Sequence, residues 1–156
     1  MKCANCGGTI HINEACTKCG ISYDDMINSI KHPEIKRLFK TIEKRQNNHE
    51  GIGMEESLMA CELVNSSMIL PIKLTDNGMD ALQIPGPDGK TYLAIFTDID
   101  EFKRGNVEMT PVTNSWDLLI ALLNDNLNGF VINVFGEAVI FTRDFLDLYF
   151  KDEVEE

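Results

Sequence analysis

Two Cys-x-x-Cys pairs at the start of the chain limit its possible folds more than any other feature. Nine residues separate the pairs, which comprise Cys3, Cys6, Cys16 and Cys19. Four thiolates at this spacing converge on one tetrahedral metal ion and hold together a segment too short to bury a core. Gly7 and Gly20, which follow the two pairs, suit the positive-φ backbone of the tight turns. The sequence therefore predicts a zinc ribbon over residues 1–21 that binds one Zn²⁺.

Other chemistries fit the pattern of these cysteines less well than zinc binding does. Two disulfides require an oxidising compartment, yet Met1 leads into no apolar signal segment, so we expect reduced thiols and a cytoplasmic protein. A thioredoxin-like site uses a single pair beside a βαβ unit. Iron fits the same four thiolates and stays open as the alternative metal. His11 is an alternative ligand but is expected at the ribbon surface, and Cys61 is expected to be a small buried residue.

Charge is distributed unevenly along the 156 residues, whose net charge is −11. Residues 1–45 carry +3, whereas residues 46–156 carry −14. An acidic body repels phosphate backbones and anionic membranes, so nucleic-acid binding is disfavoured except through the N-terminal part. No run of about 18 apolar residues occurs, and we expect no membrane association.

Residues 22–53 are predicted to be a helical linker. Ser22 caps a short helix, and Pro33 begins a second one that reaches about residue 45. Its apolar residues recur on one face, at Ile35, Leu38, Phe39 and Ile42. Basic residues on its other faces form a possible partner-binding surface, comprising Lys36, Arg37, Lys40 and Lys44. The stripe is expected to pack on the body or on a second copy of the chain, which would form a homodimer.

Residues 54–156 alternate helical and strand patterns, which indicates an α+β fold with a mixed or antiparallel sheet covered by helices. Helices are predicted at 55–66, 99–105, 116–128 and 143–150, and strands at 68–74, 91–96, 109–113, 130–135 and 138–141. Met54, Leu58 and Cys61 share one face of the first helix. Pro71 predicts an edge or irregular strand position, because proline cannot donate to a ladder. Asn128-Gly129 is expected to close a helix, and residues 151–156 to form an acidic tail.

Two motifs in this body resemble the SseB family N-terminal domain, that of enhanced serine sensitivity protein B. They are Phe96-Thr97-Asp98, after a predicted strand, and Val131-Ile132-Asn133-x-Phe135-Gly136-Glu137, before the last strand and helix. The resemblance covers about residues 54–150, with Val134 where the family commonly has proline. It implies an α+β fold and no defined reaction.

No catalytic set is recognisable in the sequence. Its three histidines, His11, His32 and His49, precede the body, and no phosphate loop, dinucleotide fingerprint or zinc-protease motif occurs. The leading hypothesis is a non-catalytic protein-interaction module, and the alternatives are nucleic-acid binding through the N-terminal arm and small-ligand sensing by the body. A possible interaction surface comprises Asp98, Asn133, Phe135 and Gly136, if the turns that carry them meet.

Overall fold

The structure is a computed structural model that describes residues 1–150, so the expected acidic tail lies outside it. The helices of this range are α1 (Tyr23–Asn28), α2 (Pro33–Asn47), α3 (Gly53–Val64), α4 (Ile99–Lys103), α5 (Trp116–Leu122) and α6 (Arg143–Phe150). The strands are β1 (Ser67–Thr75), β2 (Gly78–Ala81), β3 (Gln83–Pro85), β4 (Thr91–Ile95), β5 (Thr110–Ser115), β6 (Leu127–Ile132) and β7 (Val139–Thr142). No helix in residues 1–150 combines the length and apolar character that crossing a membrane requires.

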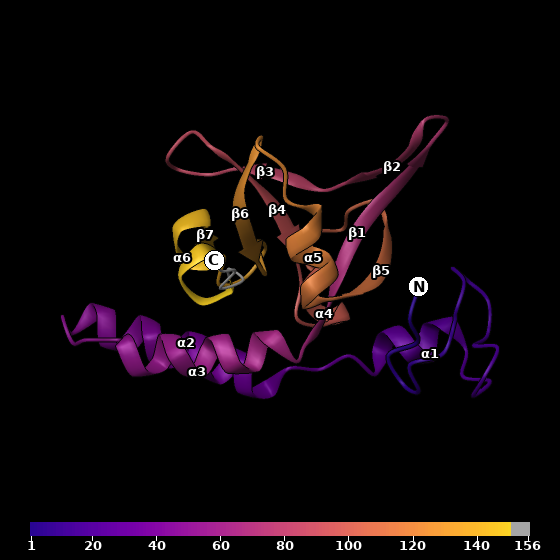
Figure 1. Cartoon of the computed structure of the whole chain (residues 1–156), viewed down its shortest axis with the longest axis horizontal. Coiled ribbons are helices and arrows are strands. Elements are labelled where there is room, and N and C mark those ends of the chain that lie inside the picture. The colour runs from indigo at the N-terminus through magenta and orange to yellow at the C-terminus, as the bar shows by residue number, and fades with distance from the viewer. Residues whose placement is uncertain (151–156) are drawn as a thin grey trace, which may run out of the picture.

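The strands form two sheets, and the predicted α+β class is confirmed. One sheet has the order β2-β1-β5 and is antiparallel. The other has the order β3-β4-β6-β7 and is mixed, because β4 runs parallel to β6. Ile69 and Phe96 exchange two backbone hydrogen bonds of 2.9 and 2.8 Å, which join the sheets where β1 meets the end of β4. Helices α2 and α3 lie side by side below both sheets (Figure 1).

Of the two positions predicted for Pro71, the edge is wrong, because β1 is the central strand of its sheet. The irregular position is supported, because the β1–β2 ladder begins only at Ile72, one residue later. Pro71 faces Pro111 of β5 in the antiparallel ladder. Its carbonyl accepts a hydrogen bond of 3.2 Å from the Leu82 N–H, on the side away from β5. Since the N–H and C=O of a strand residue point the same way, the nitrogen of Pro71 also faces away from β5. The missing N–H therefore removes no bond from the β1–β5 ladder.

Helix α2 begins at Pro33, as the sequence predicts, and its apolar stripe packs inside the chain. Ile35, Leu38 and Phe39 are buried in one hydrophobic core with Met59 and Leu63 of α3. The stripe was expected to pack either on the body or on a second copy of the chain. In the structure it packs on the body of the same chain.

Helix α3 turns a different face to the core from the one that carries Met54, Leu58 and Cys61. Those three residues are exposed, Met54 by 73%, whereas Met59 and Leu63 are fully buried. The expectation that Cys61 is a small buried residue is therefore wrong. The reason is tertiary: α3 packs against α2, α5 and α6, and only one of its two partly apolar faces is covered there.

The segment after α5 also differs from the prediction, because the helix ends at Leu122 and β6 begins at Leu127. Gly129 lies inside β6 with φ of +139°, so Asn128-Gly129 does not close a helix. A Cβ atom on Gly129 would lie 1.9 Å from the Phe141 carbonyl oxygen of β7. Glycine is needed there for close strand pairing.

The N-terminal segment packs on the body. Ile10 and Met26 are fully buried and belong to a second core that includes Ile69 and Phe96. The Tyr23 hydroxyl of α1 donates to the Pro111 carbonyl of β5. The ribbon and α1 lie at the end of the molecule opposite α6 (Figure 1).

Candidate metal centre and strand-end network

The four N-terminal cysteines converge as the sequence predicts. Their Sγ atoms all lie within 4.8 Å of one another, with 3.9 Å between Cys3 and Cys19 and 3.5 Å between Cys6 and Cys16. A tetrahedral zinc with bonds of about 2.3 Å requires sulfur–sulfur separations of about 3.8 Å. The cluster therefore has the size of a site that can hold one metal ion.

Each half of the cluster is a tight turn whose backbone points at sulfur. Gly7 and Gly20 have φ of 78° and 77°, which confirms the predicted turn geometry. Three sulfurs, those of Cys3, Cys6 and Cys16, each accept a 3.4 Å hydrogen bond from the N–H two residues later, at Asn5, Gly8 and Lys18. These donors favour the thiolate form, which is the form that binds metal.

Crowding of the sulfurs makes a cation necessary if all four are to be ionised. The Gly8 N–H favours the Cys6 thiolate, but desolvation and the neighbouring sulfurs outweigh it and raise the pKa of Cys6 to about 11. The N–H groups of Cys19 and Lys18 lower the pKa of Cys16 to about 6. One thiol thus ionises easily while its neighbour keeps its proton, and ionising both would place two negative charges 3.5 Å apart, where they repel. A divalent cation removes that repulsion.

Neither disulfides nor ligation by His11 finds support in the geometry, whereas iron fits the same four sulfurs as zinc does. All five cysteines are free. His11 is exposed, and it is not among the residues whose ligand atoms converge in the described chain. With four sulfurs around one point, the site has no position left for a reacting water.

A second cluster lies where the parallel strands β4 and β6 end. Asn133, after β6, accepts a hydrogen bond of 3.0 Å from the Thr97 N–H, after β4. Asp98 follows Thr97 and caps α4 by accepting a 3.1 Å bond from the Glu101 N–H. Asp98 and Asn133 are only 4% and 1% exposed. The two turns therefore meet, but these two side chains are used inside the protein.

Lys36 of α2 completes this strand-end network. Its Nζ lies 3.3 Å from Asp98 Oδ2 and 3.0 Å from Glu101 Oε2. Burial opposes the charge of Lys36, but the two carboxylates outweigh it and raise the pKa of Lys36. Arg104 approaches Glu101 to 3.5 Å from the solvent side. The network joins the basic helix to the strand ends.

The remaining candidate residues lie near this network or in solvent. Phe135 stacks on Phe96 with ring centroids 5.6 Å apart, and a Cβ on exposed Gly136 would lie 2.7 Å from Glu101 Oε1. In the basic set, Arg37 pairs with Glu34 at 2.7 Å, whereas Lys40 and Lys44 are exposed.

Thr97 and Glu101 are the members of the network that the sequence analysis did not select. Asp98 and Glu101 have the Asp-x-x-Glu spacing of a helix capping box, and this spacing was the available signal. Glu101 pairs with Lys36 of α2, which is distant in sequence, so the spacing alone did not indicate this contact.

Comparison with protein families settles the relationship of the body. A family model described as the SseB protein N-terminal domain matches residues 53–147. The chain belongs to the SseB family. The SseB match begins at α3, spans every described strand and ends within α6, so the cysteine cluster, α1 and α2 precede it. Comparisons with curated proteins and with solved structures gave no match.

Proposed function

We propose that this member of the SseB family is a zinc-containing, non-catalytic cytoplasmic protein that acts by binding a protein partner. The observation that carries the proposal is the closed cluster of four sulfurs within 4.8 Å of one another. Such a set suits a structural ion, because all four ligand positions are occupied by thiolates. Zinc is proposed over iron because closed four-thiolate sites in small ribbons are typical zinc sites.

The packing of the cluster supports a structural role for the ion. Cys3 and Cys16 are 2% and 4% exposed and share a core with Ile69 and Phe96 of the SseB domain. A metal that orders the ribbon therefore also covers part of that core. Loss of the metal is expected to expose apolar surface of the domain as well as to loosen the ribbon.

The strand-end network argues against catalysis by its carboxylates. Asp98 is bonded to Thr97, Glu101 and Lys36, and the amide of Asn133 is bonded to Thr97. A general acid or base must be able to reach a substrate proton. These groups are buried and already satisfied, as groups that hold a fold together are.

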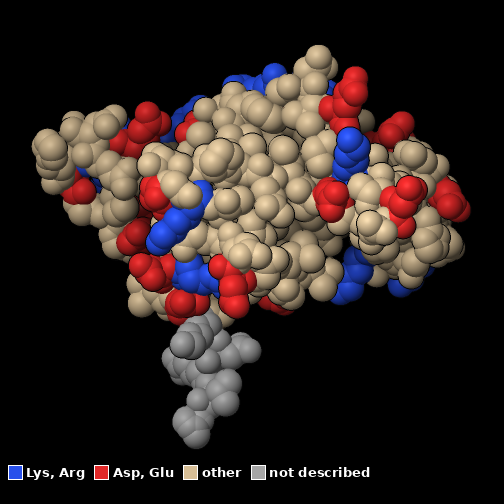
Figure 2. Space-filling view, turned by 90° about the horizontal axis from the view of Figure 1, so that it is seen from above, with Lys and Arg blue, Asp and Glu red and all other residues tan. Residues whose placement is uncertain are grey.

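The charges favour a protein partner over nucleic acid. Lys36, Arg37 and Arg45 of α2 each lie within 3.5 Å of a carboxylate of the same chain, which reduces the cationic surface that a phosphate backbone would meet. Seen from above, charged side chains lie around the edges of the molecule and uncharged residues fill its centre (Figure 2). A largely uncharged face bordered by charges is a common setting for protein contacts.

Metal analysis of the full chain, purified without chelator, tests the zinc part of the proposal. We expect one zinc per chain, and a Cys19→Ser variant with less metal and faster proteolysis of residues 1–21. A Cys61→Ser variant is the matched control, since Cys61 is exposed and outside the cluster. Iron at one per chain, or a Cys19→Ser variant that behaves like the control, contradicts it. Binding to nucleic acid that falls steeply between about 50 and 200 mM salt would favour the nucleic-acid alternative.

A further inference from the structure

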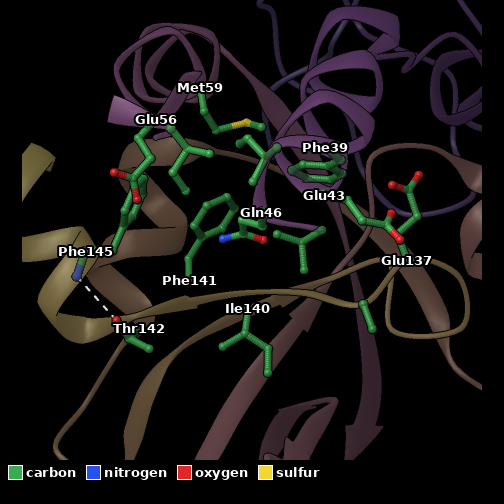
Figure 3. A pocket seen from close by; sticks show the side chains of 14 residues that line it. Phe39, Glu43, Gln46, Glu56, Met59, Glu137, Ile140, Phe141, Thr142 and Phe145 are labelled. Atoms are coloured by element: carbon green, nitrogen blue, oxygen red, sulfur yellow. Dashed lines mark hydrogen bonds between the residues drawn. The ribbon is translucent and has the colours of Figure 1, made fainter. Parts of the chain in front are cut away.

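A groove lies between α2, α3, β7 and the start of α6, away from the metal centre (Figure 3). It encloses about 450 Å³, within the range of sites that hold ligands or side chains of a partner. Its residues lie between Phe39 and Phe145, so the cysteine ribbon contributes none of them.

The groove follows the outer edge of β7. Six consecutive residues, 137–142, line it. Successive strand residues point to opposite faces of a sheet, so a groove lined by neighbours such as Ile140 and Phe141 runs along the edge of the strand. In the order β3-β4-β6-β7, β7 is the terminal strand.

The backbone of this edge is open to a further strand. Val139, Ile140 and Phe141 pair with Ile132, Val131 and Phe130 on the β6 side. Within residues 1–150, their main-chain groups form no hydrogen bond outside this ladder. An exposed edge of this kind is a template for an added strand.

The floor of the groove is apolar and firmly built. Phe141 lies between Phe39 and Phe145, with ring centroids 6.3 and 4.8 Å away, and Met59 closes the α3 side. Figure 3 shows these side chains gathered between the helices and the strand. Such a floor suits apolar side chains of an occupant.

The rim is acidic, with Glu43 on α2, Glu56 on α3 and Glu137 just before β7. None of the three forms an ion pair within the described residues. Desolvation raises the pKa of Glu137, Lys40 lowers it, and Glu43 adds to the rise, so the net shift is upward. A cation placed beside Glu43 and Glu137 would stabilise both carboxylates, and a second cation could meet Glu56 on the α3 side.

We propose that the groove binds an extended segment of a partner protein in which apolar residues alternate with lysine or arginine, and that this segment pairs with the edge of β7. The proposal names the partner chemistry for the interaction function proposed above and rests on it. Residues 152–156 of the chain contain four acidic residues, so its own C-terminal segment would be repelled. A second copy is disfavoured in the same way, because residues 46–156 carry −14.

The probe is a labelled seven-residue peptide that alternates lysine with valine and phenylalanine, with binding to the full chain followed by fluorescence anisotropy. The triple variant Glu43→Gln, Glu56→Gln, Glu137→Gln is expected to bind at least tenfold more weakly. Its matched control, Glu14→Gln, Glu62→Gln, Glu108→Gln, changes the net charge equally at exposed sites outside the groove and should stay within twofold.

A second pair of variants tests position without removing any acid. Gln46→Lys places a cation on the groove wall and is expected to weaken binding severalfold, whereas Asn47→Lys adds the same charge one residue outside the lining and should not. Both sites are exposed near the end of α2, so the fold is expected to persist. Equal behaviour of the two lysine variants, or of the two triple variants, overturns the proposal.

Peptide variants test the mode of binding. A peptide with glutamate in place of lysine should bind at least tenfold more weakly. So should a peptide methylated on alternate backbone nitrogens. Binding of the unmodified lysine peptide should shift the amide resonances of residues 139–141. Tight binding of the methylated peptide, or shifts confined to other strands, contradicts strand addition. Octylamine that competes as well as the peptide would assign the groove to a small organic cation instead. The ribbon contributes no groove residue. The peptide-binding result can therefore be interpreted even if metal analysis finds no zinc.

Discussion

The ammonium group of Lys36, in a helix that precedes the SseB match, lies 3.3 Å from the carboxylate of Asp98 at the end of β4. The same ammonium lies 3.0 Å from Glu101 Oε2. Two carboxylates of 6% side-chain exposure therefore share one partly buried cation. The basic helix is thus tied electrostatically to the domain that follows it.

Replacing Lys36 by methionine should destabilise the protein, because Asp98 and Glu101 would keep their burial and lose their common cation. We expect the free energy of unfolding to fall by about 1–3 kcal/mol, since the ammonium is partly exposed to solvent. Urea denaturation at pH 7 measures the change. Lys44→Met, at an exposed position of the same helix, should change it by less than about 0.5 kcal/mol. Equal losses in both variants would show that the ion pairs contribute nothing.

Asp98 should make stability depend on acid pH. Burial opposes its charge, but the Glu101 N–H, Lys36 and Thr97 outweigh burial and hold the pKa of Asp98 below its ordinary value. A depressed folded-state pKa gives stability that is present above the unfolded pKa, about 3.9, and is lost as pH falls through the folded value. The difference in unfolding free energy between wild type and Asp98→Asn should therefore shrink below about pH 4. A difference that is constant from pH 7 to 2.5 would refute this assignment.

Tyr23 should make stability depend on alkaline pH. Burial, with a smaller contribution from Asp24, raises the pKa of Tyr23 from 10.0 to about 12. A raised folded-state pKa gives stability that is complete below pH 10 and is lost as pH rises towards 12. Tyr23→Phe removes the bond to the Pro111 carbonyl and should cost about 1–2 kcal/mol at neutral pH. The difference in unfolding free energy between wild type and variant should narrow from pH 9 to pH 11. A difference that widens over this range would contradict a raised pKa for Tyr23.

Gly129→Ala should be among the most damaging single-methyl additions in the chain. The new Cβ would lie 1.9 Å from the Phe141 carbonyl oxygen, at a backbone φ of +139°. Strand β7 would have to separate from β6, at a cost of about 3 kcal/mol or more. Gly51→Ala is the control, because nothing lies within 4 Å of the added atom there. Thermal denaturation that places both variants near wild type would show that β6 and β7 pair more loosely than the structure indicates.

The metal cluster and the N-terminal helices were predictable because their signals are local. The Cys-x-x-Cys-Gly spacing determines the turn geometry, and Ser22 and Pro33 mark helix starts independently of the rest of the fold. The convergence of Asp98 with Asn133 was anticipated as a possibility from two turns. Parallel pairing of β4 with β6 brought those turns together.

Predictions failed where tertiary contacts decide between local options. Helix α3 carries two partly apolar faces, and the sequence alone did not show that the one with Met59 would be covered and the one with Leu58 exposed. Pro71 is tolerated in a central strand only because of the register that sets it opposite Pro111. The short strands β2 and β3 were not predicted, although Asp76-Asn77-Gly78 is a hairpin signal. The groove beside β7 draws on four separate elements, and no local pattern predicts it.

Native mass spectrometry of the full chain tests the central claim most directly, because one spectrum reports both bound metal and subunit number. The account predicts a species whose mass exceeds that of the apo chain by one zinc ion, and a shift to the bare mass when Cys6 and Cys19 are both replaced by serine. A wild-type chain observed only at its bare mass would contradict the account.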